Sequence, residues 1–89
     1  MAIITLLTDS GESDFYVGAV KAKIISINSG LTLVDISHAI LPCDIAHGAH
    51  VLKSVFRDFP KGTVHLAGVD STGNRDDQFL AIQLEDHYF

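Results

Sequence analysis

The feature that most constrains this 89-residue chain is a succession of apolar segments that alternates between strand length and helix length. The first segment, residues 2–8, is a continuous apolar run with β-branched residues, which is typical of a strand buried on both faces. Further strands are predicted over residues 31–36, 63–69 and 79–84, and residues 87–89 indicate the start of another. The first three strands are far enough apart for a helix to lie between each pair.

Two helices are predicted in these intervals. The first is expected to begin at Ser13 or Asp14, either of which can cap it. It is expected to end just before Gly30, and Gly30 is expected to adopt the left-handed conformation that often follows a helix. The second is expected to run from Pro42, which suits a first helical turn, to about Asp58.

A strand–helix–strand–helix–strand order at this spacing predicts two right-handed βαβ units and a parallel sheet. We therefore expect an α/β fold: a three-layer, Rossmann-like, mostly parallel sheet in βαβαβ order. Residues 1–89 are expected to form a single partial domain. The hydrophobic content of 47% is high for so short a chain and suits apolar faces completed by other sequence, although a compact apolar domain explains it as well.

Composition argues against several classes of partner. The net charge is −5 and the six basic residues are scattered, so no basic stripe is available to follow nucleic acid. No apolar run approaches the roughly 20 residues that span a bilayer, and the first residues do not resemble a signal peptide. The single cysteine excludes an internal disulfide and indicates a reducing, cytoplasmic location.

Polar residues follow each of the first three predicted strands. They form the clusters 9–14, Ser37-His38 and 70–74. Because parallel strands end at the same edge of a sheet, these clusters are expected to converge where α/β sheets bind ligands. The pattern predicts a site for a small polar ligand at this edge.

Two carboxylates stand out within these clusters. Asp9 can accept hydrogen bonds from both hydroxyls of a ribose, or it can simply cap its own loop. Asp70 is expected to face the same space, so that one carboxylate holds substrate while the other handles a proton. The glycine-rich phosphate-binding motifs are missing from the sequence, which disfavours a pyrophosphate cofactor. A nucleoside, if one binds, is expected to be held by its sugar and base.

The five histidines do not form a metal-binding pattern, and we expect no metal site. His47 and His50 lie three residues apart on the second predicted helix and are expected to face solvent. His38 lies on the ligand-binding edge, where we expect a structural hydrogen bond. Cys43 is expected to be a small buried residue that fills space rather than a nucleophile.

Four segments, taken in order, carry the motifs of one family: IITLLTDSGESDFYVGAVKAKI, LTLVDISHAILPCDIAHGAHVL, FPKGTVHLAGVD and HYF. Several independent motifs in the right order make a much stronger signal than any one alone. Throughout its length the chain resembles the N-terminal domain of the S-adenosylmethionine (SAM) hydroxide adenosyltransferases and the related adenosyl halogenases.

The resemblance implies in-line attack of a nucleophile on the 5′ carbon of SAM, with methionine leaving and no cofactor taking part. In the hydrolysing members the nucleophile is water and the products are adenosine and methionine. The resemblance also implies a homotrimer whose active sites lie between the N-terminal domain of one subunit and a C-terminal β-rich domain of the next. That second domain is absent from this chain, which by itself is not expected to be a competent enzyme.

The resemblance assigns roles to matching residues. Asp9 holds the ribose hydroxyls and Asp14 supports that loop, while Asp70 belongs to an Asp-Arg-His group that positions the attacking water. Ser71 and Thr72, directly after Asp70, are further substrate-binding candidates.

The chain departs from the family pattern at three places. Ser10 stands where an aromatic residue is usual, and residues 71–74 replace the usual Pro-Gly-Val-Gly. Arg75 stands two residues before the position of the family arginine, which Asp77 occupies, so Arg75 is a candidate for that role rather than a match.

Three functions remain open from the sequence. Hydrolysis of SAM is favoured over halogenation, because the halogenases carry a tyrosine at the position of Asp70 and this carboxylate repels a halide. The alternatives are an adenosine- or SAM-binding domain without catalysis and a plain assembly domain whose edge loops are only polar caps.

Overall fold

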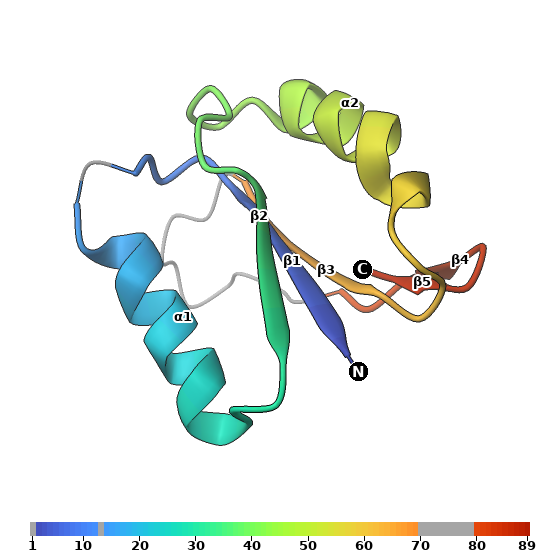
Figure 1. Ribbon diagram of the computed structural model, residues 1–89. Helices are drawn as coiled ribbons and strands as arrows, with labels where there is room; N and C mark the ends of the chain where they lie inside the picture. The colour runs from blue at the N-terminus through green and yellow to red at the C-terminus, as the bar shows by residue number, and fades with distance from the viewer. Residues whose placement is uncertain (1, 13, 70–79) are drawn as a thin grey trace.

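The structure, a computed structural model, describes residues 2–12, 14–69 and 80–89. It confirms an α/β fold, with elements in the order strand, helix, strand, helix, strand followed by a short hairpin (Figure 1). The elements are β1 (Ile3–Thr8), α1 (Tyr16–Ile27), β2 (Thr32–Ser37), α2 (Ile45–Val55), the 3-10 turn η1 (Phe56–Asp58), β3 (Val64–Gly68), β4 (Gln83–Leu84) and β5 (His87–Tyr88).

The described strands form one mostly parallel sheet in the order β2-β1-β3-β5-β4. β1 pairs in parallel with both β2 and β3, and β5 continues the parallel pairing beyond β3. The hairpin partners β4 and β5 are antiparallel. Of the strand predicted over residues 79–84, the described part forms a strand at Gln83–Leu84 alone, and residue 79 lies outside the described residues.

The two helices lie on opposite faces of this sheet (Figure 1). The chain moves from β1 to β2 in one direction and then back past β1 to β3, so right-handed crossovers place α1 and α2 on opposite sides. Leu6 pairs with Asp35 on the face toward α1, where Lys21 reaches Asp35. Leu7 points the other way and lies beside Gly48 of α2. The predicted three-layer arrangement is confirmed.

The ends of α1 differ from the prediction. Phe15, not Asp14, occupies the N-cap position, and Asp14 Oδ1 accepts a hydrogen bond from the N–H of Phe15, its immediate neighbour. Ser13 lies outside the described residues. At the other end Asn28 is extended, and its Oδ1 accepts a hydrogen bond from the N–H of Gly30. A local side-chain turn therefore ends the helix, so that Gly30 needs no left-handed conformation.

The helix α2 also begins later than predicted. Asp44 is its N-cap, and Asp44 Oδ1 accepts a hydrogen bond from the N–H of His47 at 2.9 Å, so Pro42 lies outside the helix. A carboxylate that accepts a free N–H of the first turn stabilises the start of a helix. The last turn tightens into η1 and ends at Asp58, the residue where we expected the helix to end.

The core between the sheet and α2 combines apolar side chains with buried polar ones. Thr5 Oγ1 and the Nδ1 atom of His65 are 2.7 Å apart, and Nε2 of His65 lies 3.1 Å from Nδ1 of His87. The Phe56 ring meets both imidazoles edge-on, while Phe89 stacks on His65. Burial, together with the charge of His87, lowers the pKa of His65 from its ordinary value. The sequence placed His65 on a strand but gave no sign of this pairing.

Replacing Gly48 with leucine tests the packing of α2. A Cβ atom at this position meets Val69 Cγ2 at 3.0 Å and Leu7 Cδ2 at 3.7 Å, so a larger side chain overpacks the interface. We expect Gly48→Leu to lower the free energy of unfolding by about 1–3 kcal/mol, measured by urea denaturation. Gly18→Leu on α1 is the matched control, because nothing lies within 4 Å of its Cβ and leucine favours helix more than glycine does. Equal losses for the two variants contradict the packing described here.

The lowered pKa of His65 predicts a pH dependence of stability. Between that lowered pKa and the ordinary value of 6.5, the unfolded chain binds more protons than the folded one. The contribution of uncharged His65 to the stability of the folded state is therefore complete above pH 6.5. It is lost as the pH falls through this window. In urea titrations at several pH values, His65→Gln should make this decline shallower, because glutamine does not titrate. His50→Gln, at an exposed position on α2, is the control; an unchanged slope in His65→Gln refutes the assignment.

Candidate functional site

The carboxyl ends of the three long strands meet at one edge of the sheet. In the register of the sheet, Thr8 of β1 pairs with Gly68 of β3 and Leu7 of β1 pairs with Ser37 of β2. Asp9 and His38 follow directly, so they lie at the same edge, as predicted. The chain leaves β1 toward β2 and leaves β3 in the opposite direction, which makes the gap between β1 and β3 a topological switch point.

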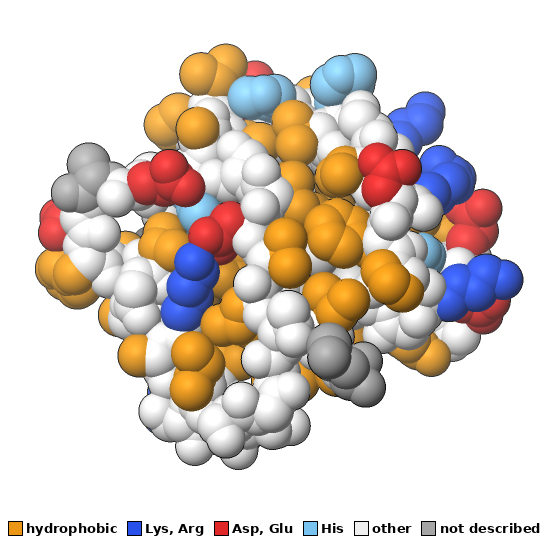
Figure 2. Space-filling model, viewed as in Figure 1, with side chains coloured by type: hydrophobic (Ala, Val, Ile, Leu, Met, Phe, Trp, Pro, Cys, Tyr) orange, Lys and Arg blue, Asp and Glu red, His pale blue; other side chains and the backbone are white. Residues whose placement is uncertain are grey.

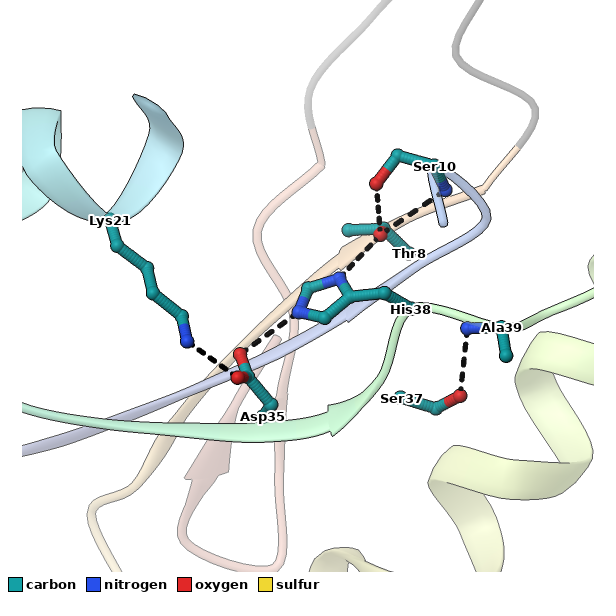
Figure 3. Close-up of polar contacts among 7 residues, drawn as sticks. All are labelled: Thr8, Ser10, Lys21, Asp35, Ser37, His38 and Ala39. Carbon is teal, nitrogen blue, oxygen red and sulfur yellow. Dashed lines mark hydrogen bonds and ion pairs between the residues drawn. The ribbon is translucent and has the colours of Figure 1, made fainter. Parts of the chain in front are cut away.

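The loop after β1 is fastened to the segment after β2. Thr8 Oγ1 lies 2.7 Å from Nδ1 of His38, and the N–H of Gly11 donates to the carbonyl oxygen of His38 at 2.8 Å. Thr8 Oγ1 also contacts Ser10 Oγ at 2.8 Å and accepts the Ser10 N–H at 3.3 Å. His38 therefore holds residues before and after Asp9 (Figure 3).

His38 is itself held by charged side chains. Its ring is 2% exposed, and its Nε2 atom lies 2.9 Å from Asp35 Oδ1. The other oxygen of Asp35 accepts a hydrogen bond from Lys21 of α1 at 2.5 Å (Figure 3). Burial raises the pKa of Asp35, but hydrogen bonds and charge from Lys21 and His38 act against it, and the net pKa lies below the ordinary 3.8. The structural hydrogen bond expected of His38 is therefore present.

Asp9 is bound by a backbone group distant in sequence. Its Oδ2 atom accepts a hydrogen bond from the N–H of Cys43 at 2.9 Å. Cys43 has a left-handed backbone with φ of 60°, a conformation that costs a non-glycine residue on the order of 1 kcal/mol. This contact favours a fixed carboxylate over a residue that merely caps its own loop.

The expectation for Cys43 was wrong, because the residue is exposed rather than buried. The left-handed turn directs its N–H toward Asp9 and carries the residue to the surface. The prediction for His50 is confirmed, since it is exposed. His47 is only half-buried, because its Nδ1 accepts the N–H of Leu41 at 3.1 Å.

Of the remaining predicted site residues, the structure describes Asp14 alone, and no hydrogen bond joins it to this network. Asp14 is exposed near the start of α1 and accepts the N–H of Phe15. Asp70, Ser71, Thr72 and Arg75 lie outside the described residues.

Sequence reasoning missed three members of the network: Thr8, Lys21 and Asp35. The Asp35-x-x-His38 spacing at the end of a strand was a signal that the sequence offered, because i and i+3 side chains can meet where the chain turns. Lys21 had no such local signal, since it reaches Asp35 from another element. In the part of the chain that the structure describes, no group of three or more His, Cys, Asp or Glu side chains is arranged to hold a metal ion.

Chemically, this edge presents oxygen acceptors in a fixed arrangement and suits a ligand rich in hydroxyl or amine donors. A separate groove lies between β2 and α2, lined mostly by apolar side chains such as Ile36, Val51, Val55 and Phe59. Figure 2 shows hydrophobic side chains gathered there. The groove does not include Asp9, Ser10 or His38, so we assign the polar site to the edge. Among the described residues, no helix has the length and apolar character to cross a membrane.

The chain is similar to known proteins over nearly its whole length. The model of the SAM hydroxide adenosyltransferase N-terminal domain matches residues 4–89. The (R)-S-adenosyl-L-methionine hydrolase of Methanocaldococcus jannaschii is 40% identical over 98% of this chain and 34% of its own length. A fluorinase of Actinoplanes sp. is 39% identical over 70% of this chain and 21% of its own.

Solved structures show the same relationship. The crystal structure of an uncharacterized conserved protein from Thermotoga maritima matches with a TM-score of 0.91 and 36% identity, covering 97% of this chain and 34% of that one. The chain spans about a third of the length of this protein and of the archaeal hydrolase. With a family match over nearly all its residues and a shared fold, the chain belongs to the SAM hydroxide adenosyltransferase family, of which it carries the N-terminal domain.

Proposed function

We propose that the intact protein hydrolyses SAM to adenosine and methionine. The observation that carries the proposal is the Asp9 carboxylate, held by the Cys43 N–H at the switch point of the sheet. The relative from Methanocaldococcus jannaschii, named as a SAM hydrolase, supports the same reaction. On the strength of the family resemblance, we further propose a trimer in which a C-terminal β-rich domain of the neighbouring subunit completes each site.

In this proposal each site residue has a separate task. Asp9 accepts hydrogen bonds from the ribose hydroxyls, and Asp14 supports the loop that carries it. Ser71 and Thr72 contact the substrate after β3, and Arg75 supplies positive charge beside Asp70. His38 supports the loop that carries Asp9, through its contacts with Thr8 and Gly11.

The chemistry demands little beyond alignment and a proton acceptor. Water oxygen forms a bond to the 5′ carbon as the bond from that carbon to sulfur breaks, and methionine leaves with the electron pair. The sulfonium is an excellent leaving group, so positioning supplies much of the acceleration and no cofactor is required. Asp70 orients the attacking water and takes its proton.

Two other functions compete with hydrolysis. Ser10 is polar and tied to Thr8, which favours a domain that binds adenosine or SAM without turnover, because part of an apolar wall is then missing. The fluorinase relatives raise halogenation as the other alternative. Asp70 argues against it, since a carboxylate repels a halide where water needs a proton acceptor.

Removing the charge of Asp9 tests the binding role. Asp9→Asn keeps the shape of the side chain but weakens charge-assisted hydrogen bonds, each of which contributes roughly 1.5–3 kcal/mol. Titration calorimetry should show adenosine binding about tenfold weaker or more. Asp58→Asn, an exposed carboxylate on η1, is the control and should bind like the unmodified protein. If Asp9→Asn binds adenosine as tightly as the unmodified protein does, Asp9 does not hold the ribose.

Asp70→Asn tests the chemical role. Asparagine cannot take the proton from water, and the loss of a general base costs about 10²–10⁴-fold in rate. Single-turnover reactions of the intact protein with SAM should show adenosine formation slowed by that order, with adenosine affinity retained. An Asp76→Asn/Asp77→Asn double variant is the control for the other nearby carboxylates.

The same assay separates the competing functions. Binding of SAM by the unmodified protein without adenosine or methionine supports a binding domain, and a halide-dependent product supports halogenation. An Asp70→Asn protein that turns over normally beside an inactive double variant shows that a different carboxylate accepts the proton.

A further inference from the structure

Both flanks of Asp9 are held by His38, one through its buried imidazole and the other through its backbone carbonyl. Before Asp9, Thr8 Oγ1 lies 2.7 Å from His38 Nδ1; after it, the N–H of Gly11 donates to the His38 carbonyl at 2.8 Å. Ser10 is tied in through Thr8 Oγ1, which contacts its hydroxyl and accepts its N–H. These contacts to His38 hold the backbone on both sides of Asp9, and the Cys43 N–H binds the carboxylate itself.

The hydrogen-bond directions in this network follow from its charged end. Asp35 is a carboxylate and can only accept, so the hydrogen on the uncharged His38 ring lies on Nε2. Nδ1 must then accept, and the donor available to it is the Thr8 hydroxyl. With its proton committed to His38, Thr8 Oγ1 keeps its lone pairs for the N–H and the hydroxyl of Ser10. With this tautomer, each contact has one donor and one acceptor.

The network is anchored away from the ligand edge. Lys21 of α1 binds the second oxygen of Asp35, so the orientation of the His38 ring depends on the position of a helix on one face of the sheet (Figure 3). Asp35, His38 and Thr8 come from two neighbouring strands and their ends. The chain of contacts joins α1, β2 and β1 before it reaches the Asp9 loop.

We propose that His38 is a positioning residue, which acts through Thr8 to hold the Asp9 carboxylate in the orientation that receives the hydroxyl donors of a nucleoside. This inference rests on the function proposed above, and it assigns to His38, Thr8, Asp35 and Lys21 a part in ligand affinity. His38 does not touch the ligand.

The same strand contains a matched pair without this role. Thr5 Oγ1 and His65 Nδ1 are also 2.7 Å apart, and both residues are buried. Thr5 lies three residues before Thr8 on β1 and pairs with His65 of β3, within the strand rather than at its carboxyl end. Removing either threonine hydroxyl breaks a threonine–histidine contact, but only Thr8 borders the Asp9 loop.

The test compares Thr8→Val with Thr5→Val in the intact protein. Each change removes a hydroxyl while keeping the shape of the side chain. Adenosine affinity is measured by calorimetry and the free energy of unfolding by urea denaturation. We expect adenosine to bind Thr8→Val about tenfold more weakly, since hydrogen bonds to a charged group contribute roughly 1.5–3 kcal/mol each and depend on its orientation. Thr5→Val should bind normally although its stability falls, and Thr8→Ser should restore affinity to within about twofold.

The outcomes are distinguishable. If the unmodified protein does not bind adenosine, the proposed function and this inference both fail. If it binds and Thr8→Val binds equally well, only the positioning role fails. A parallel loss of affinity in Thr5→Val also overturns it, because the effect then reflects general stability.

A second variant decides the matter should Thr8→Val fail to fold. Lys21→Met breaks the far end of the network at a partly exposed side chain. It should weaken adenosine binding several-fold, whereas Lys23→Met, at an exposed position on the same helix, should not. Unchanged affinity in Lys21→Met overturns the proposal. In nitrogen NMR of the unmodified protein, the uncharged His38 ring should carry its hydrogen on Nε2, and a ring protonated on Nδ1 instead contradicts the network.

Discussion

The pairing of β1 in parallel with a strand on each side is the constraint on which the rest of this structure depends. Because the chain crosses to β2 and then returns to β3, its two helices cover opposite faces and its loops diverge at one edge. The path of the backbone thereby brings the loop after β1 and the segment after β2 close together, whatever side chains they carry. Side-chain chemistry then decides what that edge can bind.

That chemistry is an ordered set of hydrogen bonds rather than a large cavity. The Lys21–Asp35 pair is partly exposed, so its contribution to stability is screened by solvent and is small. Its contribution to order is larger, because an ionised Asp35 accepts a hydrogen bond from Nε2 of His38 and so holds the ring with Nδ1 toward Thr8. A modest surface ion pair can in this way determine the geometry of a loop on a different element.

The sequence predicted the first three strands, their parallel pairing and the convergence of Asp9 and His38, because apolar runs and the handedness of crossovers decide these features. The predicted helix ends were wrong where a local hydrogen bond competed with intrinsic propensity. The helix α2 begins after Asp44 rather than at Pro42, and α1 ends at a turn made by Asn28 rather than at a left-handed Gly30. The sequence also failed at contacts between distant segments, such as Asp9 with the Cys43 N–H, for which local pattern carries no information. The proposed catalytic residue Asp70 was reached through motif order and resemblance and stays a prediction.

The position of Asp35 has a consequence for self-association. β2 is the outermost of the described strands on its side of the sheet, and such an edge presents backbone groups to which another strand can add. Asp35 lies within that edge strand, bound to Lys21. A strand added alongside β2 must desolvate part of this ion pair, which costs free energy that the new backbone hydrogen bonds have to offset. The carboxylate that orients His38 therefore also discourages the sheet from growing into an aggregate.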